Sequence, residues 1–115
     1  MKKIILSLVV ALLGICSASA QVHTIQVTDF AFEPNTISIQ KGDTVQWINM
    51  TRNPHTTTSG SPCVADGKWN SGELKVKGTF TYVFTDTGTF KYFCIPHCDM
   101  GMVGNIVVIG KGKNK

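Results

Sequence analysis

Apolar and polar positions alternate with a period of two along most of residues 22–109, the pattern of strands with one buried face. The alternating runs are short, rich in β-branched and aromatic residues, and separated by turn residues, most clearly at 41–43 and 86–88. The pattern predicts strands at residues 22–28, 36–40, 44–49, 79–84, 89–94 and 105–109.

Six or seven short strands without any helical period favour an all-β fold, a two-sheet β-sandwich that closes partly toward a barrel. The poorly patterned region is 56–77, which is rich in Gly, Ser, Pro and Asn, so we expect loops there with at most one short edge strand. No repeat or linker divides the chain, and a single domain is therefore predicted.

The first twenty residues have the form of a signal peptide. A basic start at 1–3 precedes an apolar run at 4–15 and a small-residue cleavage site at Ala18-Ser19-Ala20. The apolar run is shorter than the roughly 20 residues that span a bilayer. We predict that residues 1–20 are a signal peptide, and that the mature protein is periplasmic or secreted and not inserted in a membrane.

Cysteine usage fits an exported chain with one thiol in a special role. Cleavage would remove Cys16, whose lipidation is the alternative, although Ile15 stands where a lipidation signal needs a small residue. Cysteines tend to pair in an oxidising compartment. The remaining Cys63, Cys94 and Cys98 are odd in number, which leaves one thiol for another task.

The charge balance excludes an obvious nucleic-acid binder. The whole chain has 11 Lys and Arg against 7 Asp and Glu, a net charge of +4, and the signal peptide takes two lysines of that excess. No basic cluster interleaved with aromatic residues is present, so no nucleic-acid partner is expected. Residues 111–115 have lysine at alternate positions and are predicted to be a basic flexible tail after a domain at 21–110.

Residues 93–104 combine sulfur and imidazole at a density that a turn does not need. Cys94, His97 and Met102 would lie in a loop between two strands at one end of the sandwich. A loop from another strand pair can bring His55 to the same end. Two imidazoles, one thiolate and a weak thioether suit a trigonal copper site with a long axial bond, which holds both Cu(I) and Cu(II).

Three motifs extend this pattern. They are Phe-x-Pro-x-x-Ile-x-Ile-x-x-Gly-Asp-Thr-Val-x-Trp-x-Asn at 32–49, Asn-Pro-His at 53–55, and Tyr-x-Cys-x-x-His-x4-Met at 92–102. With them the sequence resembles the cupredoxins of the plastocyanin and pseudoazurin type over residues 21–110. The resemblance implies an eight-stranded Greek-key sandwich with one type 1 copper ion. His55, Cys94 and His97 would be the equatorial ligands, and Met102, rather than Met100, the axial one.

The resemblance also implies a function. We expect an exported mononuclear blue-copper protein that shuttles single electrons between larger redox proteins and is not an enzyme. Its partners would dock transiently near His97, at an apolar surface, and the protein would be a monomer. The alternative is a copper delivery or storage protein with the same ligands.

Cys98 departs from the family pattern. The spacing Cys94-x3-Cys98 resembles the two-copper centre of cytochrome oxidase, but the residue four positions after Cys98 is Met102, where that centre needs a histidine. A disulfide between Cys63 and Cys98 is the better hypothesis, because it leaves Cys94 for the metal.

The sequence also predicts roles for residues that are not proposed metal ligands. Asn49 and Asn53 are both candidates to hydrogen-bond the backbone near Cys94. Alternation places Phe93 on the opposite side of its strand from Cys94, at a position where plant plastocyanins expose a tyrosine. His23 is expected to be structural. We expect core positions for the aromatic residues Phe30, Phe32, Trp47, Phe80, Tyr82, Phe84, Phe90 and Tyr92.

Overall fold

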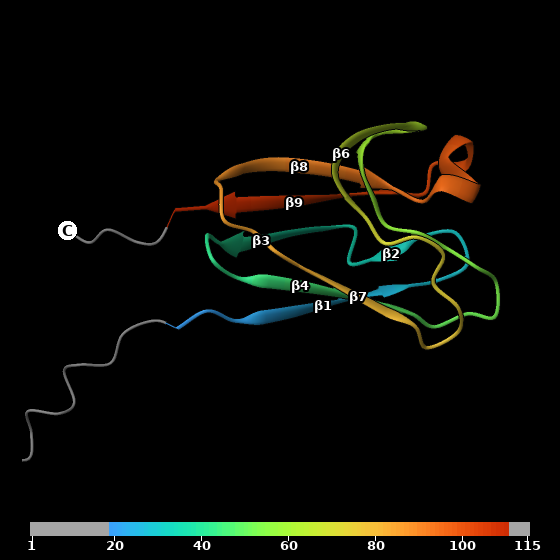
Figure 1. The fold of residues 1–115 in the computed structure, drawn as a ribbon, viewed down its shortest axis with the longest axis horizontal. Helices are drawn as coiled ribbons and strands as arrows, with labels where there is room; N and C mark the ends of the chain where they lie inside the picture. Colours follow the sequence, from blue (N-terminus) through green and yellow to red (C-terminus); the bar gives the residue numbers. More distant parts are fainter. Residues whose placement is uncertain (1–18, 111–115) are drawn as a thin grey trace, which may run out of the picture.

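The computed structural model describes residues 19–110, so most of the predicted signal peptide and all of the predicted tail lie outside the described residues. Two β-sheets pack against each other (Figure 1). One has the strand order β2-β1-β4-β7, with β1 at Val22–Val27, β2 at Phe32–Glu33, β4 at Thr44–Asn49 and β7 at Thr79–Val83. The other has the order β3-β9-β8-β5-β6, with β3 at Thr36–Gln40, β5 at Thr58–Ser61, β6 at Val64–Asn70, β8 at Gly88–Phe93 and β9 at Val103–Ile109.

The chain crosses repeatedly between the two sheets, so several neighbouring strands are not consecutive along the chain. After β2 the chain passes to the other sheet, where β3 pairs with β9. It then returns to the first sheet, where β4 pairs with β1. The β1–β4 and β3–β9 pairs are parallel, and the remaining strand pairs within the described residues are antiparallel. The predicted all-β sandwich is therefore confirmed.

Alternation in the sequence sets the core. Every second residue of β4 is buried, and the same holds for β9, so both strands bury one face. Side chains from both sheets form one cluster, whose largest fully buried members are Trp47, Tyr92, Phe32 and Phe84. Phe80, Tyr82 and Phe90 pack against this cluster while partly exposed.

Residues 56–77 correct one prediction, because they contain two strands where loops with at most one short edge strand were expected. Strands β5 and β6 form an antiparallel hairpin, and β6 is an edge strand. The buried hydroxyls that made the segment look like a loop are satisfied inside the hairpin. Ser59 Oγ, for example, accepts a hydrogen bond from Trp69 N (2.9 Å) and donates to Asp66 Oδ1 (2.6 Å).

The close contact between Gly104 and the Tyr92 ring predicts that Gly104→Ala destabilises the fold. Gly104 lies opposite Tyr92 in the β8–β9 register, and a Cβ atom at Gly104 would overlap the tyrosine ring. Gly104→Ala is therefore expected to lower the free energy of unfolding by about 1 to 3 kcal/mol, the usual range for overpacking. Urea unfolding of the two proteins measures this difference.

Gly110→Ala is the matched control, since a Cβ there meets nothing within 4 Å. An equal loss of stability in the two variants would contradict the explanation by overlap with the Tyr92 ring.

Candidate metal centre

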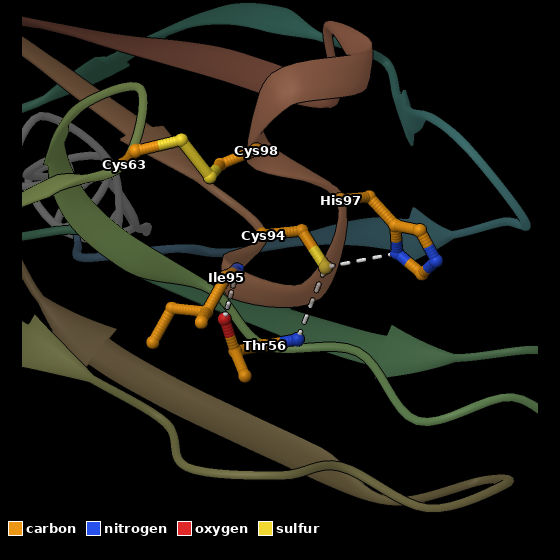
Figure 2. The surroundings of a disulfide bond; sticks show 6 residues. All are labelled: Thr56, Cys63, Cys94, Ile95, His97 and Cys98. Carbon is orange, nitrogen blue, oxygen red and sulfur yellow. Dashed lines mark hydrogen bonds between the residues drawn. A yellow bond between two sulfur atoms is a disulfide. The ribbon is translucent and has the colours of Figure 1, made fainter.

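Three elements bring the predicted ligands to one end of the sandwich. Cys94 directly follows β8, and His97 lies in η1, a 3-10 segment at Ile95–Met100 (Figure 2). His55 comes from the β4–β5 connection. The ligand atoms of these three residues all lie within 4.8 Å of one another.

The distances fit a metal ion between the three side chains. Cys94 Sγ is 3.6 Å from His55 Nδ1 and 3.5 Å from His97 Nδ1. A borderline-soft ion such as Zn²⁺ has bonds of about 2.0 to 2.1 Å to nitrogen and about 2.3 Å to sulfur. A nitrogen and a sulfur atom bound to one ion at about 120° would therefore be roughly 3.8 Å apart. The side chains therefore already stand close to trigonal spacing.

Backbone hydrogen bonds shape the ligand loop. His97 N donates to Cys94 O (3.1 Å), and Cys94 N donates to Met102 O (3.1 Å). Gly101 ends η1 in the left-handed conformation, with φ of 82°, which glycine adopts without steric cost. The chain thus turns back so that Met102, which is fully buried, lies beside Cys94.

His55 is fixed on both sides. Its Nε2 is 3.1 Å from Thr51 Oγ1, and its backbone forms an antiparallel bridge with Leu74. That contact orients the ring so that Nδ1 faces Cys94. Burial, with a smaller contribution from His97, lowers the pKa of His55, so the ring stays neutral and keeps a lone pair for a metal.

The Cys94 thiol is buried, and burial raises its pKa, although backbone N–H groups of Thr56 and His97 partly oppose the shift. Thr56 N lies 3.5 Å from the sulfur. A thiolate in this position needs a neighbouring cation, and metal coordination deprotonates a thiol. The chemistry of the thiol therefore fits a metal ligand.

A disulfide joins Cys63 and Cys98, which confirms the predicted pairing (Figure 2). Cys63 lies at the β5–β6 turn, and Cys98 directly follows His97, so the bond ties the hairpin to the ligand loop. Within the described residues, Cys94 is the free cysteine. Because the sulfur of Cys98 is used in the disulfide, the two-copper interpretation fails.

Thr56 was not identified from the sequence as a neighbour of the site. Besides its N–H toward the sulfur, its Oγ1 accepts a hydrogen bond from Ile95 N (2.9 Å; Figure 2). The candidates Asn49 and Asn53 were wrong, since Asn49 Nδ2 donates to Leu74 O and Asn53 O, and Asn53 Nδ2 donates to Asp29. The position of Thr56 directly after His55 was the available signal.

An exposed aromatic ring covers the outer side of His97. Phe30 was expected in the core but is 55% exposed, and its ring meets that of His97 edge-on, with the centroids 5.2 Å apart. Ile95 and Met100 are also exposed nearby in the sequence. Phe93 is buried, so the strand exposes no aromatic ring at that position.

His23 lies outside this cluster, as expected. Its Nε2 is 2.9 Å from Asp43 Oδ2, and Asp43 also accepts hydrogen bonds from the backbone of Gln21 and Gln40. The residue therefore has the structural role predicted for it. No helix within residues 19–110 has the length and apolar character needed to cross a bilayer.

Comparisons with known proteins agree with this geometry. The sequence model of the copper-binding proteins of the plastocyanin/azurin family matches residues 19–109. A plastocyanin of Synechococcus sp. is 30% identical over 93% of this chain and 90% of its own length. The chloroplastic plastocyanin of Tetradesmus obliquus is 36% identical over 67% of this chain, which spans only 57% of that relative.

Solved cupredoxin structures superimpose on this chain. A purple cupredoxin from Nitrosopumilus maritimus is 26% identical, with a TM-score of 0.69 over 75% of this chain and 98% of its own. An oxidised variant of amicyanin, 24% identical, superimposes with a TM-score of 0.66 over 83% of this chain and 87% of its own, and shows the shared fold.

Proposed function

Because the chain belongs to the plastocyanin/azurin family of copper-binding proteins, we propose that it binds one copper ion and carries single electrons between redox proteins. The observation that carries the proposal is the convergence of His55, Cys94 and His97, with Cys94 left free and buried while Cys63 and Cys98 are paired. Copper bound there supplies a one-electron couple between Cu(II) and Cu(I).

Met102 is the proposed axial ligand. It is fully buried next to Cys94, whereas Met100 is 58% exposed. The thioether of Met102, held in place by the surrounding core, would supply the weak fourth ligand to the copper ion. Met100 belongs instead to the apolar surface.

The protein matrix holds the ligands in one arrangement. His55 is held by Thr51 and Leu74, and the loop of His97 is held by the disulfide at Cys98. A site that changes little between two oxidation states transfers electrons with little reorganisation, so this rigidity suits a carrier. Burial of His55 and Cys94 excludes water from the inner side of the site.

Electrons would enter and leave through the partly exposed ring of His97. Phe30, which packs on that ring, together with Ile95 and Met100, which are exposed on η1, would supply an apolar surface for a redox partner. A carrier must dock briefly, which fits an interface below about 1,200 Å² and a monomeric protein. The apolar character of this surface supports a partner with a matching apolar patch.

We further propose that the protein works outside the cytoplasm, without membrane insertion. The Cys63–Cys98 disulfide supports an oxidising compartment, in which such bonds persist. The predicted signal peptide at residues 1–20 gives the same location, periplasmic or secreted.

Copper titration tests the proposed function. One equivalent of Cu(II) added to the metal-free protein is expected to produce an intense visible band that bleaches on reduction and returns on reoxidation. A colourless product with the fold intact would contradict copper binding through Cys94. Ready loss of Cu(I) to a competing chelator during the cycle would favour delivery over electron transfer.

A further inference from the structure

We propose that Thr58 and Asn70 are positioning residues that tune the reduction potential of the site through Thr56. This inference rests on the proposed function. The three residues form a continuous line of hydrogen bonds, here called the hydroxyl chain, made of Thr56 Oγ1, Thr58 Oγ1 and Asn70 Oδ1. Thr56 Oγ1 is 2.9 Å from Thr58 Oγ1, which is 3.1 Å from Asn70 Oδ1.

The direction of the hydroxyl chain follows from its outer end. Gly72 N donates to Asn70 Oδ1 (3.0 Å), and only the amide oxygen can accept from a backbone N–H. Thr58 must therefore donate its hydrogen to Asn70. A hydroxyl has a single hydrogen, so Thr58 can only accept from Thr56.

The inner end of the hydroxyl chain meets the backbone at Cys94. Thr56 Oγ1 accepts from Ile95 N at 2.9 Å, and Ile95 directly follows Cys94 (Figure 2). Each donor in the series Ile95, Thr56 and Thr58 thus points away from the copper cysteine and toward Asn70. Hydrogen bonds aligned in one direction polarise and strengthen one another in a buried setting.

Thr56, at the inner end of the hydroxyl chain, also contacts the sulfur of Cys94. The backbone N–H of Thr56 points to Cys94 Sγ at 3.5 Å. A hydrogen bond to the sulfur withdraws charge from the thiolate and favours the reduced metal over the oxidised one. By fixing the side chain of Thr56, the hydroxyl chain fixes this N–H as well.

Burial makes the hydroxyl chain sensitive to one missing atom. Thr58 is fully buried and Thr56 is 6% exposed, so water cannot easily replace a lost partner. Asn70 is exposed, which places the outer end of the hydroxyl chain at the protein surface. The potential of the metal site is thereby linked to a residue on the edge strand β6.

Thr58→Val tests the inference, because valine keeps the shape of threonine and removes the hydroxyl. Relative to wild type, the ratio of Cu(I) to Cu(II) at a fixed applied potential is expected to fall about threefold to tenfold, the size of one hydrogen bond. For a one-electron couple this is a decrease of about 30 to 60 mV. Protein-film voltammetry measures it.

A second readout needs no metal. In the metal-free Thr58→Val protein, hydrogen exchange at the amide of Ile95 is expected to accelerate about tenfold, because its acceptor on Thr56 is no longer held. Unchanged exchange at that amide would overturn the inference, whatever the potential does.

Two variants separate the hydroxyl from general loosening. Thr57→Val removes an equally buried hydroxyl that accepts from Trp69 Nε1 and lies outside the hydroxyl chain. It is expected to lower stability and leave the potential unchanged, and an equal shift in Thr57→Val and Thr58→Val would overturn the inference. Thr58→Ser keeps the hydroxyl and is expected to restore the wild-type potential, so a shift as large as that of valine would also overturn it.

If Thr58→Val does not fold, Asn70→Ala replaces it as the test. It removes the outer acceptor on an exposed residue and is expected to lower the Cu(I) to Cu(II) ratio about threefold. No change would overturn the inference. Failure of the proposed function would look different, since wild-type protein would then show no intense copper band at all.

Discussion

Replacement of Cys94 with serine is expected to abolish the intense visible band of the copper-loaded protein and its reversible redox couple. The band requires charge transfer from a thiolate to Cu(II). A serine hydroxyl stays protonated and is a hard donor that does not suit Cu(I). Absorption spectra and voltammetry of the two proteins, each given one equivalent of Cu(II), measure the loss.

Met100→Leu is the control for this experiment, because Met100 is exposed and is not a proposed ligand. It is expected to keep the band and the couple. An intense band that survives in Cys94→Ser would place the copper elsewhere. A changed reduction potential in Met100→Leu would mean that the wrong methionine was assigned to the site, because the weak thioether ligand tunes the potential of such a site.

Removal of the disulfide is expected to lower the free energy of unfolding by more than Gly104→Ala does. Cys63 and Cys98 are separated by 35 residues. The chain-entropy relation gives about 3 to 4 kcal/mol for a closed loop of this size. The double variant Cys63→Ala/Cys98→Ala should therefore have a free energy of unfolding lower by about this amount, measured by denaturant titration of the copper-free proteins.

Reductant provides the control for the disulfide. It should destabilise the wild-type protein and leave the double variant unchanged. If the double variant is as stable as the oxidised wild type, the disulfide does not act through loop closure. If reductant does not change the free energy of unfolding of the wild-type protein, stabilisation by the disulfide through loop closure is also contradicted.

Spacing made most of the site predictable. Cys94, His97 and Met102 are close in the sequence, and a strand–loop–strand connection keeps such residues together. His55 lies in a distant loop, and it was linked to them because a sandwich can bring a loop from another strand pair to the same end, and then by the resemblance to a family. The sandwich itself followed from alternation, because half-buried strands have a period of two whatever their topology.

The hairpin at β5 and β6 was missed for a physical reason. The buried residues of β5 are Thr58, Ser59 and Gly60, which lack the large apolar side chains that mark a strand, and Trp69 is the one buried residue of β6. Thr58 and Ser59 are tolerated inside because other residues of the hairpin satisfy their hydroxyls, as Asn70 does for Thr58. Such partners are unknown until the fold is known, so composition alone indicated a loop.

Phe30 and Thr56 show the same limit on a smaller scale. A phenylalanine in a strand-rich sequence is usually buried, and nothing local shows that the turn after β1 carries Phe30 out to His97. Thr56 acts through its backbone N–H as well as its hydroxyl. A backbone donor is present in every residue but proline, so the sequence does not single it out.

The parallel pairing of β3 with β9 has a consequence for the order of events during folding. Thr36 pairs with Asn105, and the ligand loop directly precedes β9. Contacts this distant in sequence form late, since closing a long loop costs entropy before the contacts compensate for it. We therefore expect a chain that is still emerging from the ribosome or a translocation channel to lack the site, and copper to bind only after the last strand has docked.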